Sequence, residues 1–222
     1  MTTRLTSRTT APVTGRPLRR DAAENRARLL TAAALVFADH GLDAGVQEVA
    51  RVAGVGIGTL YRRFPSKQAL IDALVGGIRR DLLDLARTAA TRIDGTGLEE
   101  LLLTAGEPQA ARPGCLQRLW EHSGAGRDAI EEFRTRVVEL LQSAQAHGRV
   151  RTEITSTDIT MVLWSIRGVI ETTRTVAPRA WRRHLELLIA GLRPMAWDHF
   201  ATALTEKPLT TAELRRITGA GR

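Results

Sequence analysis

Residues 46–61 restrict the fold of this chain most, because two short apolar sets at helical spacing lie on either side of a single glycine. The first set stops at Gly54 and the second is closed by Pro65; together they comprise Val46, Val49, Ala50, Ala53, Ile57, Leu60 and Phe64. Ala50 is small where two helices would cross, and Gly54 can adopt the positive φ of a tight turn. The pattern predicts a helix-turn-helix whose second helix, about 56–63, presents its N-terminal residues to base edges in a DNA major groove.

The rest of the chain also has helical periodicity, without strand-like alternation or internal repeats, so we expect an all-α fold. Further helices are expected at 21–40, 66–92, 98–106, 115–122, 130–147, 158–176, 179–193 and 212–217. Ser66 is a candidate N-cap, while Gly76 and Gly77 indicate either a compliant point or a tight crossing. We expect a flexible basic arm at 1–20, a three-helix helix-turn-helix head at 21–75, a C-terminal helical ligand-binding and dimerisation domain at 76–194, and a peripheral tail at 195–222.

The positive charge is concentrated at the N-terminal end. The 222 residues carry a net charge of +8, and residues 1–80 hold 13 basic against 6 acidic side chains. Phosphate backbones attract such a segment through counterion release. RNA, an anionic membrane or solubility alone would be compatible with the same bias.

The first 20 residues lack acids, as an organellar transit peptide would, but Pro12, Gly15 and Pro17 favour a flexible arm. Arg16, Arg19 and Arg20 would then follow the minor groove or remain solvated.

Several other classes of protein are disfavoured by what the sequence lacks. The single cysteine, Cys115, permits no internal disulfide, and no cysteine and histidine spacing matches a zinc site. We find no glycine-rich phosphate loop and no nucleophile motif, and the five histidines are scattered. No apolar run is long enough to cross a bilayer. The sequence therefore predicts a cytoplasmic protein that is not an enzyme, has no cofactor or metal and has no membrane partner.

A dense group of residues resembles the DNA-binding domain of the TetR family. The matching residues are Leu29, Ala32, Ala33, Val36, Phe37, Gly41, Val49, Ala50, Ala53, Gly54, Val55, Gly58, Thr59, Leu60, Tyr61, Phe64, Pro65, Ser66, Lys67, Ala69 and Leu70. Beyond residue 70 the chain is similar only in length and helix order. The resemblance implies a homodimeric repressor that a small-molecule effector releases from palindromic double-stranded operator DNA. A DNA-binding architectural protein without an effector is the alternative, and it would show neither saturable ligand binding nor DNA release.

The resemblance also assigns roles to individual side chains of the head. Tyr61 and Lys67 occupy positions that hold phosphates, and Thr59 and Arg62 occupy positions that reach bases or the adjoining backbone. A guanidinium can form two hydrogen bonds to guanine, which makes Arg62 the best base-reading candidate. The alternatives are a core ring for Tyr61, a solvated helix start for Lys67 and a plain surface charge for Arg62.

Four positions of the predicted DNA-binding site carry few side-chain donors. At Gly56, Ile57 and Gly58 we expect thymine methyl contact, close backbone approach and reading of DNA shape. Gly45 stands where many relatives begin the second helix with Thr, Ser or Pro, so one side-chain phosphate contact is missing. Backbone N–H groups at that helix start remain available for a phosphate.

The C-terminal half is assigned by the resemblance to dimerisation and sensing. The last two long helices are expected to form a four-helix bundle with a second copy, although burial within one chain explains the pattern as well; the candidates are Ile159, Val162, Ile166, Trp181, Leu185, Leu188 and Leu192. Aromatic rings often line ligand cavities, and the effector-pocket candidates are Leu102, Cys115, Trp120, His122, Trp164 and Arg167. Arg167 is alternatively an ion-pair partner of Glu171. Effector binding is expected to shift the helix that starts at Ser66 and to change the spacing of two recognition helices.

Overall fold

A computed structural model describes residues 16–121, 125–194 and 204–219 of the chain. Every regular element in those ranges is a helix, as the periodicity predicts. The elements are α1 (Arg16–His40), α2 (Val46–Ala53), α3 (Ile57–Arg63), α4 (Lys67–Ala89), α5 (Gly97–Thr104), α6 (Gly106–Ala110), the 3-10 helix η1 (Pro113–Arg118), α7 (Arg127–Ala146), α8 (Ser156–Thr173), α9 (Ala180–Leu192) and α10 (Thr211–Gly219).

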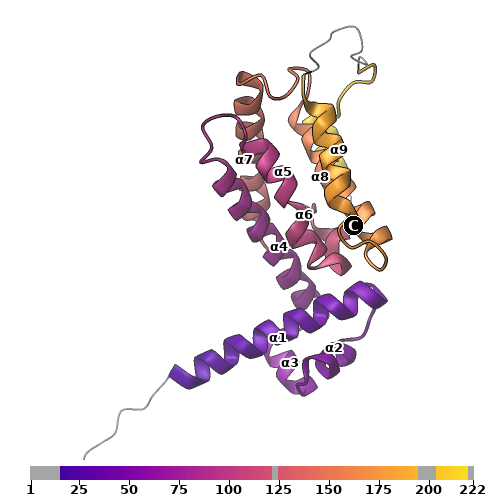
Figure 1. Cartoon of the computed structure of the whole chain (residues 1–222). Helices are drawn as coiled ribbons and strands as arrows, with labels where there is room; N and C mark the ends of the chain where they lie inside the picture. The colour runs from indigo at the N-terminus through magenta and orange to yellow at the C-terminus, as the bar shows by residue number, and fades with distance from the viewer. Residues whose placement is uncertain (1–15, 122–124, 195–203, 220–222) are drawn as a thin grey trace, which may run out of the picture.

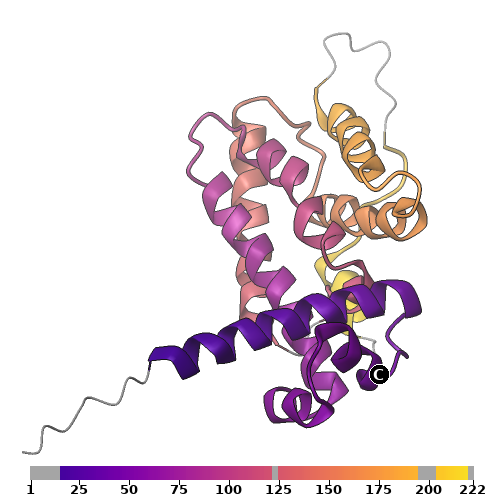
Figure 2. The ribbon, with the colours of Figure 1, turned by 60° about the horizontal axis from the view of Figure 1, so that its bottom comes forward.

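The first three helices form the head, with α1 lying across the lower end of the remaining helices (Figures 1 and 2). The apolar stripe of α1, which consists of Leu29, Ala33, Val36 and Phe37, is buried. Together with α2 and α3 it forms the core of the head. The helix begins at Arg16 rather than at the predicted Asp21. Pro17 does not prevent this, because a proline in the first helical turn removes only an N–H that has no intrahelical partner.

Helices α4 to α9 form the body, in which α4 packs along α7 and α8 packs against α9 (Figure 1). The α4 helix is continuous through Gly76 and Gly77. A Cβ atom at Gly76 would lie 3.2 Å from the carbonyl oxygen of Ala125, and one at Gly77 would lie 2.6 Å from Nη1 of Arg112. The glycine at position 76 therefore marks a tight crossing against the start of α7, not a break in α4.

The segment between α4 and α7 differs most from the sequence prediction. One helix was expected at 98–106 and another at 115–122, whereas the chain forms α5, α6 and then η1. The extra helix α6 has Pro108 at its third residue, where a proline is tolerated. Gly106 allows it to approach α9, because a Cβ there would lie 2.2 Å from the ring of Trp181.

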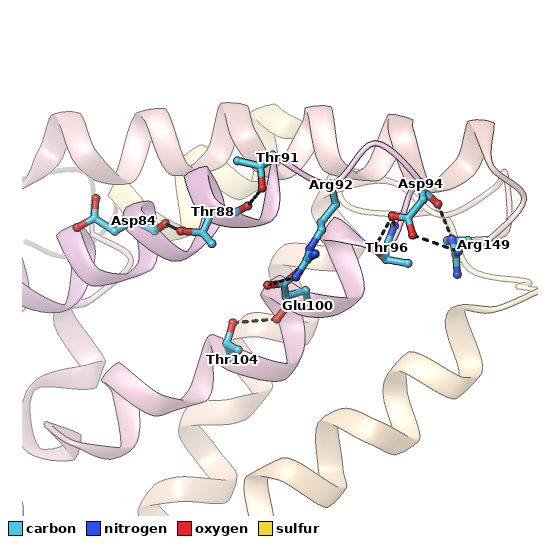
Figure 3. Close-up of polar contacts among 9 residues, drawn as sticks. All are labelled: Asp84, Thr88, Thr91, Arg92, Asp94, Thr96, Glu100, Thr104 and Arg149. Atoms are coloured by element: carbon cyan, nitrogen blue, oxygen red, sulfur yellow. Dashed lines mark hydrogen bonds and ion pairs between the residues drawn. The ribbon is translucent and has the colours of Figure 1, made fainter.

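The far end of α4 is tied to α5 and to the α7–α8 connection (Figure 3). Arg92 donates to Glu100 of α5 at 2.7 Å, and Arg149 donates to the carbonyl oxygen of Asp94 at 2.7 Å. The Asp94 carboxylate accepts from the backbone and hydroxyl of Thr96, at 3.2 and 2.6 Å, which shapes the turn. Each contact is exposed and weak alone. Together they join this end of α4 to α5 and to the α7–α8 connection.

Candidate DNA-binding site and its link to the body

The turn between α2 and α3 has the geometry that the sequence predicted. Gly54 adopts φ 66° and ψ 34°, a left-handed conformation that favours glycine. Its N–H donates to the Arg51 carbonyl at 3.1 Å, and the N–H of Val55 donates to the Ala50 carbonyl at 3.0 Å. Ala50 is buried where α2 packs in the head. These contacts fix the direction in which α3 leaves the turn.

Helix α3 is anchored on one side and exposed on the other. Leu60 is fully buried and Phe64, which follows the helix, is 4% exposed. Ile57 and Tyr61 are 40% and 45% exposed, so Tyr61 is not a core ring. The other exposed residues of this face are Gly56, Gly58, Arg62 and Arg63. A short helix with a single buried anchor presents most of its surface outward, as insertion into a groove requires.

Thr59 and Arg62 lie together on this helix. Thr59 is half-buried, and its Oγ1 accepts a hydrogen bond of 3.1 Å from Nη2 of the exposed Arg62. Both side chains border a shallow cleft between α3 and α1, which Asn25 and Leu29 complete. The hydrogen bond orients the guanidinium and leaves its other N–H groups free of that contact. Arg62 is therefore positioned by its own helix before any DNA is bound.

The two helix starts next to α3 offer backbone and side-chain donors. Ser66 caps α4, as predicted, because its Oγ accepts from the N–H of Ala69 at 3.0 Å, and half-buried Lys67 is the first residue of the helix. Gly45 is the exposed N-cap of α2 with no side-chain cap. Sequence reasoning overlooked the exposed Gln47 in the first turn of α2. Gln47 lies one helical turn before Ala50, where the two helices were predicted to cross, and this position is the sequence signal that could have identified it.

Two segments of the body contact α1 of the head. Gly114 of η1 lies so close to α1 that a Cβ there would be 2.2 Å from the carbonyl carbon of Phe37. At the end of α8, Arg174 donates to the Ala38 carbonyl at 2.6 Å and to Asp39 at 3.1 Å. Within the body, Arg118 of η1 donates to Gln68 at the start of α4 at 2.8 Å. The head therefore rests on η1 and α8 as well as continuing into α4.

A buried arginine on α4 holds the segment that follows η1. Arg79 has no exposed surface, and burial lowers the pKa of its guanidinium. It donates to four main-chain carbonyls, those of Arg118 at 3.2 Å, Leu119 at 2.9 Å, Glu121 at 2.6 Å and Ala125 at 3.2 Å. We call these contacts the Arg79 network. Because α4 begins at the head, the network connects residues 118–121 and Ala125 to the helix that leads there.

The residues predicted for an effector pocket lie in several different places. Trp120 borders a cavity of about 240 Å³ between α7, α8 and α10. Leu102 borders a separate hollow of about 20 Å³. Cys115 is a core residue, and burial raises the pKa of its thiol to about 11. His122 lies outside the described residues.

Two further pocket candidates lie on α8. Trp164 is half-buried and packs against the core. Arg167 forms an ion pair of 2.9 Å with Glu171, which was the alternative that the sequence left open. The predicted set is therefore not gathered around one cavity.

Most of the predicted dimer residues are core residues of a single chain. Ile159, Ile166, Trp181 and Leu185 are at most 2% exposed, and Leu192 is 8% exposed. Within one chain, α8 and α9 bury these side chains against each other and against α5, α6 and η1, which is the alternative that the sequence left open. Val162 and Leu188 are half-buried and keep some free surface.

The outward surface of α8 and α9 carries a different apolar set. Met161 is 46% exposed and Leu187 is 62% exposed. Gly168 and Gly191 are exposed as well, with nothing within 4 Å of an added Cβ. We call Met161, Val162, Gly168, Leu187, Leu188 and Gly191 the α8–α9 outer face. Its glycines permit close approach of another helix pair.

The described ranges contain no group of three or more His, Cys, Asp or Glu side chains placed to hold a metal ion. In the same ranges, no helix is both long enough and apolar enough to cross a membrane.

The anchored and outward-facing α3, set on a helical body, defines a helix-turn-helix DNA-binding protein. Residues 29–74 match the profile described as "Bacterial regulatory proteins, tetR family", and residues 95–194 match "Transcriptional regulator SbtR-like, C-terminal domain". The chain belongs to the TetR family of transcriptional regulators.

Individual relatives agree with this assignment. The TetR regulator SCO0520 of Streptomyces coelicolor is 32% identical, with coverage of 77% of this chain and 99% of that chain and a TM-score of 0.52. A TetR regulator of Mycobacterium vanbaalenii is 34% identical, with coverage of 80% and 100% and a TM-score of 0.53. The HTH-type transcriptional repressor KstR2 of Rhodococcus jostii is 37% identical over 81 residues, which are 36% of this chain and 40% of that repressor. The chain thus spans less than half the length of this curated relative.

Proposed function

We propose that this protein is a homodimeric repressor that binds a palindromic operator through α3 and is released from it by a small-molecule effector. The observation that carries the proposal is the outward face of α3, on which Ile57, Tyr61 and Arg62 are exposed while Leu60 anchors the helix in the core. Tyr61 and Lys67 would contact phosphates, and Arg62 would contact a base. The repressor role is proposed from the KstR2 relative, which is an HTH-type transcriptional repressor.

The α8–α9 outer face supports a dimer in this proposal. A soluble monomer seldom leaves several apolar side chains and two glycines together on two adjacent helices. A twofold pairing of this face would hold two heads on one side of the dimer. Two recognition helices would then enter major grooves about one helical turn of DNA apart, roughly 34 Å.

The link between the head and the body supports regulation. An effector that binds more tightly to the conformation unsuited to DNA lowers operator affinity. By linkage, the size of this loss is set by the difference between the effector's binding free energies for the two conformations. The Arg79 network and the Gly114 contact give the body two routes to the head, one through α4 and one through α1.

Footprinting on the DNA just upstream of the protein's own gene tests the proposal. We expect a protected site with two related halves, which Arg62→Ala and Tyr61→Ala each remove. Sedimentation should show that both variants remain dimers, because neither side chain belongs to the body. Protection that persists in both variants would refute the assignment of α3.

A second assay separates the repressor from an architectural protein. The footprint is repeated with a library of small apolar and charged compounds while tryptophan fluorescence is followed. Release by a saturable compound is expected for a sensor. If the binding is never altered by any compound, the architectural alternative replaces the sensor.

A further inference from the structure

A cavity of about 240 Å³ lies between α7 and the first half of α8, and α10 (yellow in Figure 2) contributes to its wall. Its apolar lining comprises Trp120, Phe133, Val137, Val138, Leu163 and Leu214. The rings of Trp120 and Phe133 are 6.1 Å apart between centroids. Leu214 of α10 is only 8% exposed, so α10 is packed over the cavity. The volume is below the roughly 300–1,000 Å³ of sites for drug-sized ligands, which indicates a small compound.

The polar part of the lining consists of five serine or threonine residues, two arginines and one glutamate. Arg134 of α7, whose side chain is 19% exposed, lies 2.6 Å from Glu131 and donates to the Trp120 carbonyl at 3.2 Å. Arg215 of α10 borders the same cavity. Burial lowers the pKa of the Arg134 guanidinium, and the charge of Arg215 lowers it further. Two guanidinium groups and one carboxylate give the lining a net positive charge, which an anionic ligand would balance.

We propose that this cavity binds a small amphipathic monocarboxylate and that α10 closes over it. The apolar chain or ring would pack on Trp120 and Phe133, and the carboxylate would lie between Arg134 and Arg215. Guanidinium groups suit this ligand because they offer paired N–H donors to its two oxygens. The inference rests on the proposed function, since it identifies the effector site of that regulator.

The position of Trp120 connects this cavity to the head. Its neighbours Leu119 and Glu121 provide the two shortest contacts of the Arg79 network. A carboxylate bound to Arg134 competes with the Trp120 carbonyl for the same guanidinium. The segment 118–121 would then be free to change shape, and Arg79 would transmit that change to α4.

Calorimetric titration of the full chain with octanoate and with phenylacetate tests the site, and octanamide and phenylacetamide serve as uncharged controls. We expect saturable binding of at least one acid and at least tenfold weaker binding of its amide. Arg215→Gln should weaken the acid about tenfold and leave the amide unchanged, while Arg215→Lys should retain most of the affinity. The matched control is Arg216→Gln, because Arg216 is exposed like Arg215 and lies on the same helix but outside the cavity lining.

A second variant tests the cavity itself. Val138 borders it and is 38% exposed, so Val138→Trp can fill the space without disturbing the buried core. This change should abolish binding of both acids. The proposal is overturned if neither acid saturates, if Val138→Trp binds as well as the wild type, or if Arg215→Gln and Arg216→Gln behave alike.

The same samples separate this inference from the proposed function. If a compound of another class dissociates the DNA complex while neither acid binds, the carboxylate site is wrong and the regulator stands. If the acids bind as expected but neither they nor any other compound changes DNA affinity, the site stands and the effector-controlled repressor is wrong.

Discussion

Replacing Arg79 by methionine should destabilise the protein strongly, because it removes the guanidinium of the Arg79 network while keeping an unbranched side chain that reaches as far as the position of Nε. Four main-chain carbonyls lose a charged donor, and those of Leu119 and Glu121, at 2.9 and 2.6 Å, are the shortest contacts. A buried carbonyl left without a partner costs about 1–3 kcal/mol. Two such carbonyls correspond to about 2–6 kcal/mol, and partial relief from water and relaxation lowers the expected loss to about 2–4 kcal/mol, a large part of the roughly 5–15 kcal/mol that stabilises a typical domain.

Urea unfolding followed by circular dichroism measures this loss. Arg80→Met is the matched control, because Arg80 is the next residue of α4 and is exposed, so its change should stay within about 0.5 kcal/mol. Arg79→Lys should fall between the two, since an ammonium has three donors and a shorter reach. The reasoning is refuted if Arg79→Met costs less than about 1 kcal/mol or is no worse than Arg80→Met.

Three further predictions concern the head and the core. Gly54→Ala should cost about 1–2 kcal/mol in urea unfolding because φ is 66°, whereas Gly58→Ala, with open space around its Cβ, should stabilise slightly; equal effects would contradict the turn geometry. Gly45→Ser should raise operator affinity about two- to tenfold in fluorescence anisotropy by adding a hydroxyl for a phosphate, and an unchanged affinity would show that the start of α2 does not face DNA. The Cys115 thiol, whose pKa is raised from 9.0 to about 11, should react with a thiol reagent about 100-fold more slowly in folded than in urea-unfolded protein at pH 8. Equal reactivity would show that the thiol is accessible in the folded protein. Since the pKa of this thiol is higher in the folded than in the unfolded protein, the free energy of unfolding should fall as the pH rises from about 9 to 11.

The local elements of the fold were predictable because each has its signal within a few residues. Gly54 has the left-handed conformation that its place between two apolar sets demanded, and Ser66 caps α4. The start of α1 was misplaced because Pro17 was interpreted as a helix breaker, although a proline is compatible with a first turn. Helix α6 was missed because Gly106 and Pro108 look like turn residues unless the nearby ring of Trp181 is known.

Side-chain environments that depend on distant segments were not predictable. The apolar stripes of α8 and α9, which contain Ile166 and Leu185, fit a dimer interface as well as a core. Only the packing of α8 on α9 and on other helices distinguishes an interface from a core. Nothing near Arg79 in the sequence indicates that its acceptors lie about 40 residues later. Likewise, Trp120 was singled out by its residue type, but Arg134, Arg215 and the wall formed by α10 required the three-dimensional structure.

The central claim, that α3 reads DNA through Arg62, is tested most directly by a binding profile over every single-base variant of the protected site. Wild-type protein should discriminate at one base pair in each half-site by about 1–3 kcal/mol more than Arg62→Ala does, while discrimination at the other positions is retained. Tyr61→Phe, which removes a hydroxyl expected to contact a phosphate, should weaken all variants by a similar factor. If Arg62→Ala keeps the complete base preference of the wild type, the account of this helix is wrong.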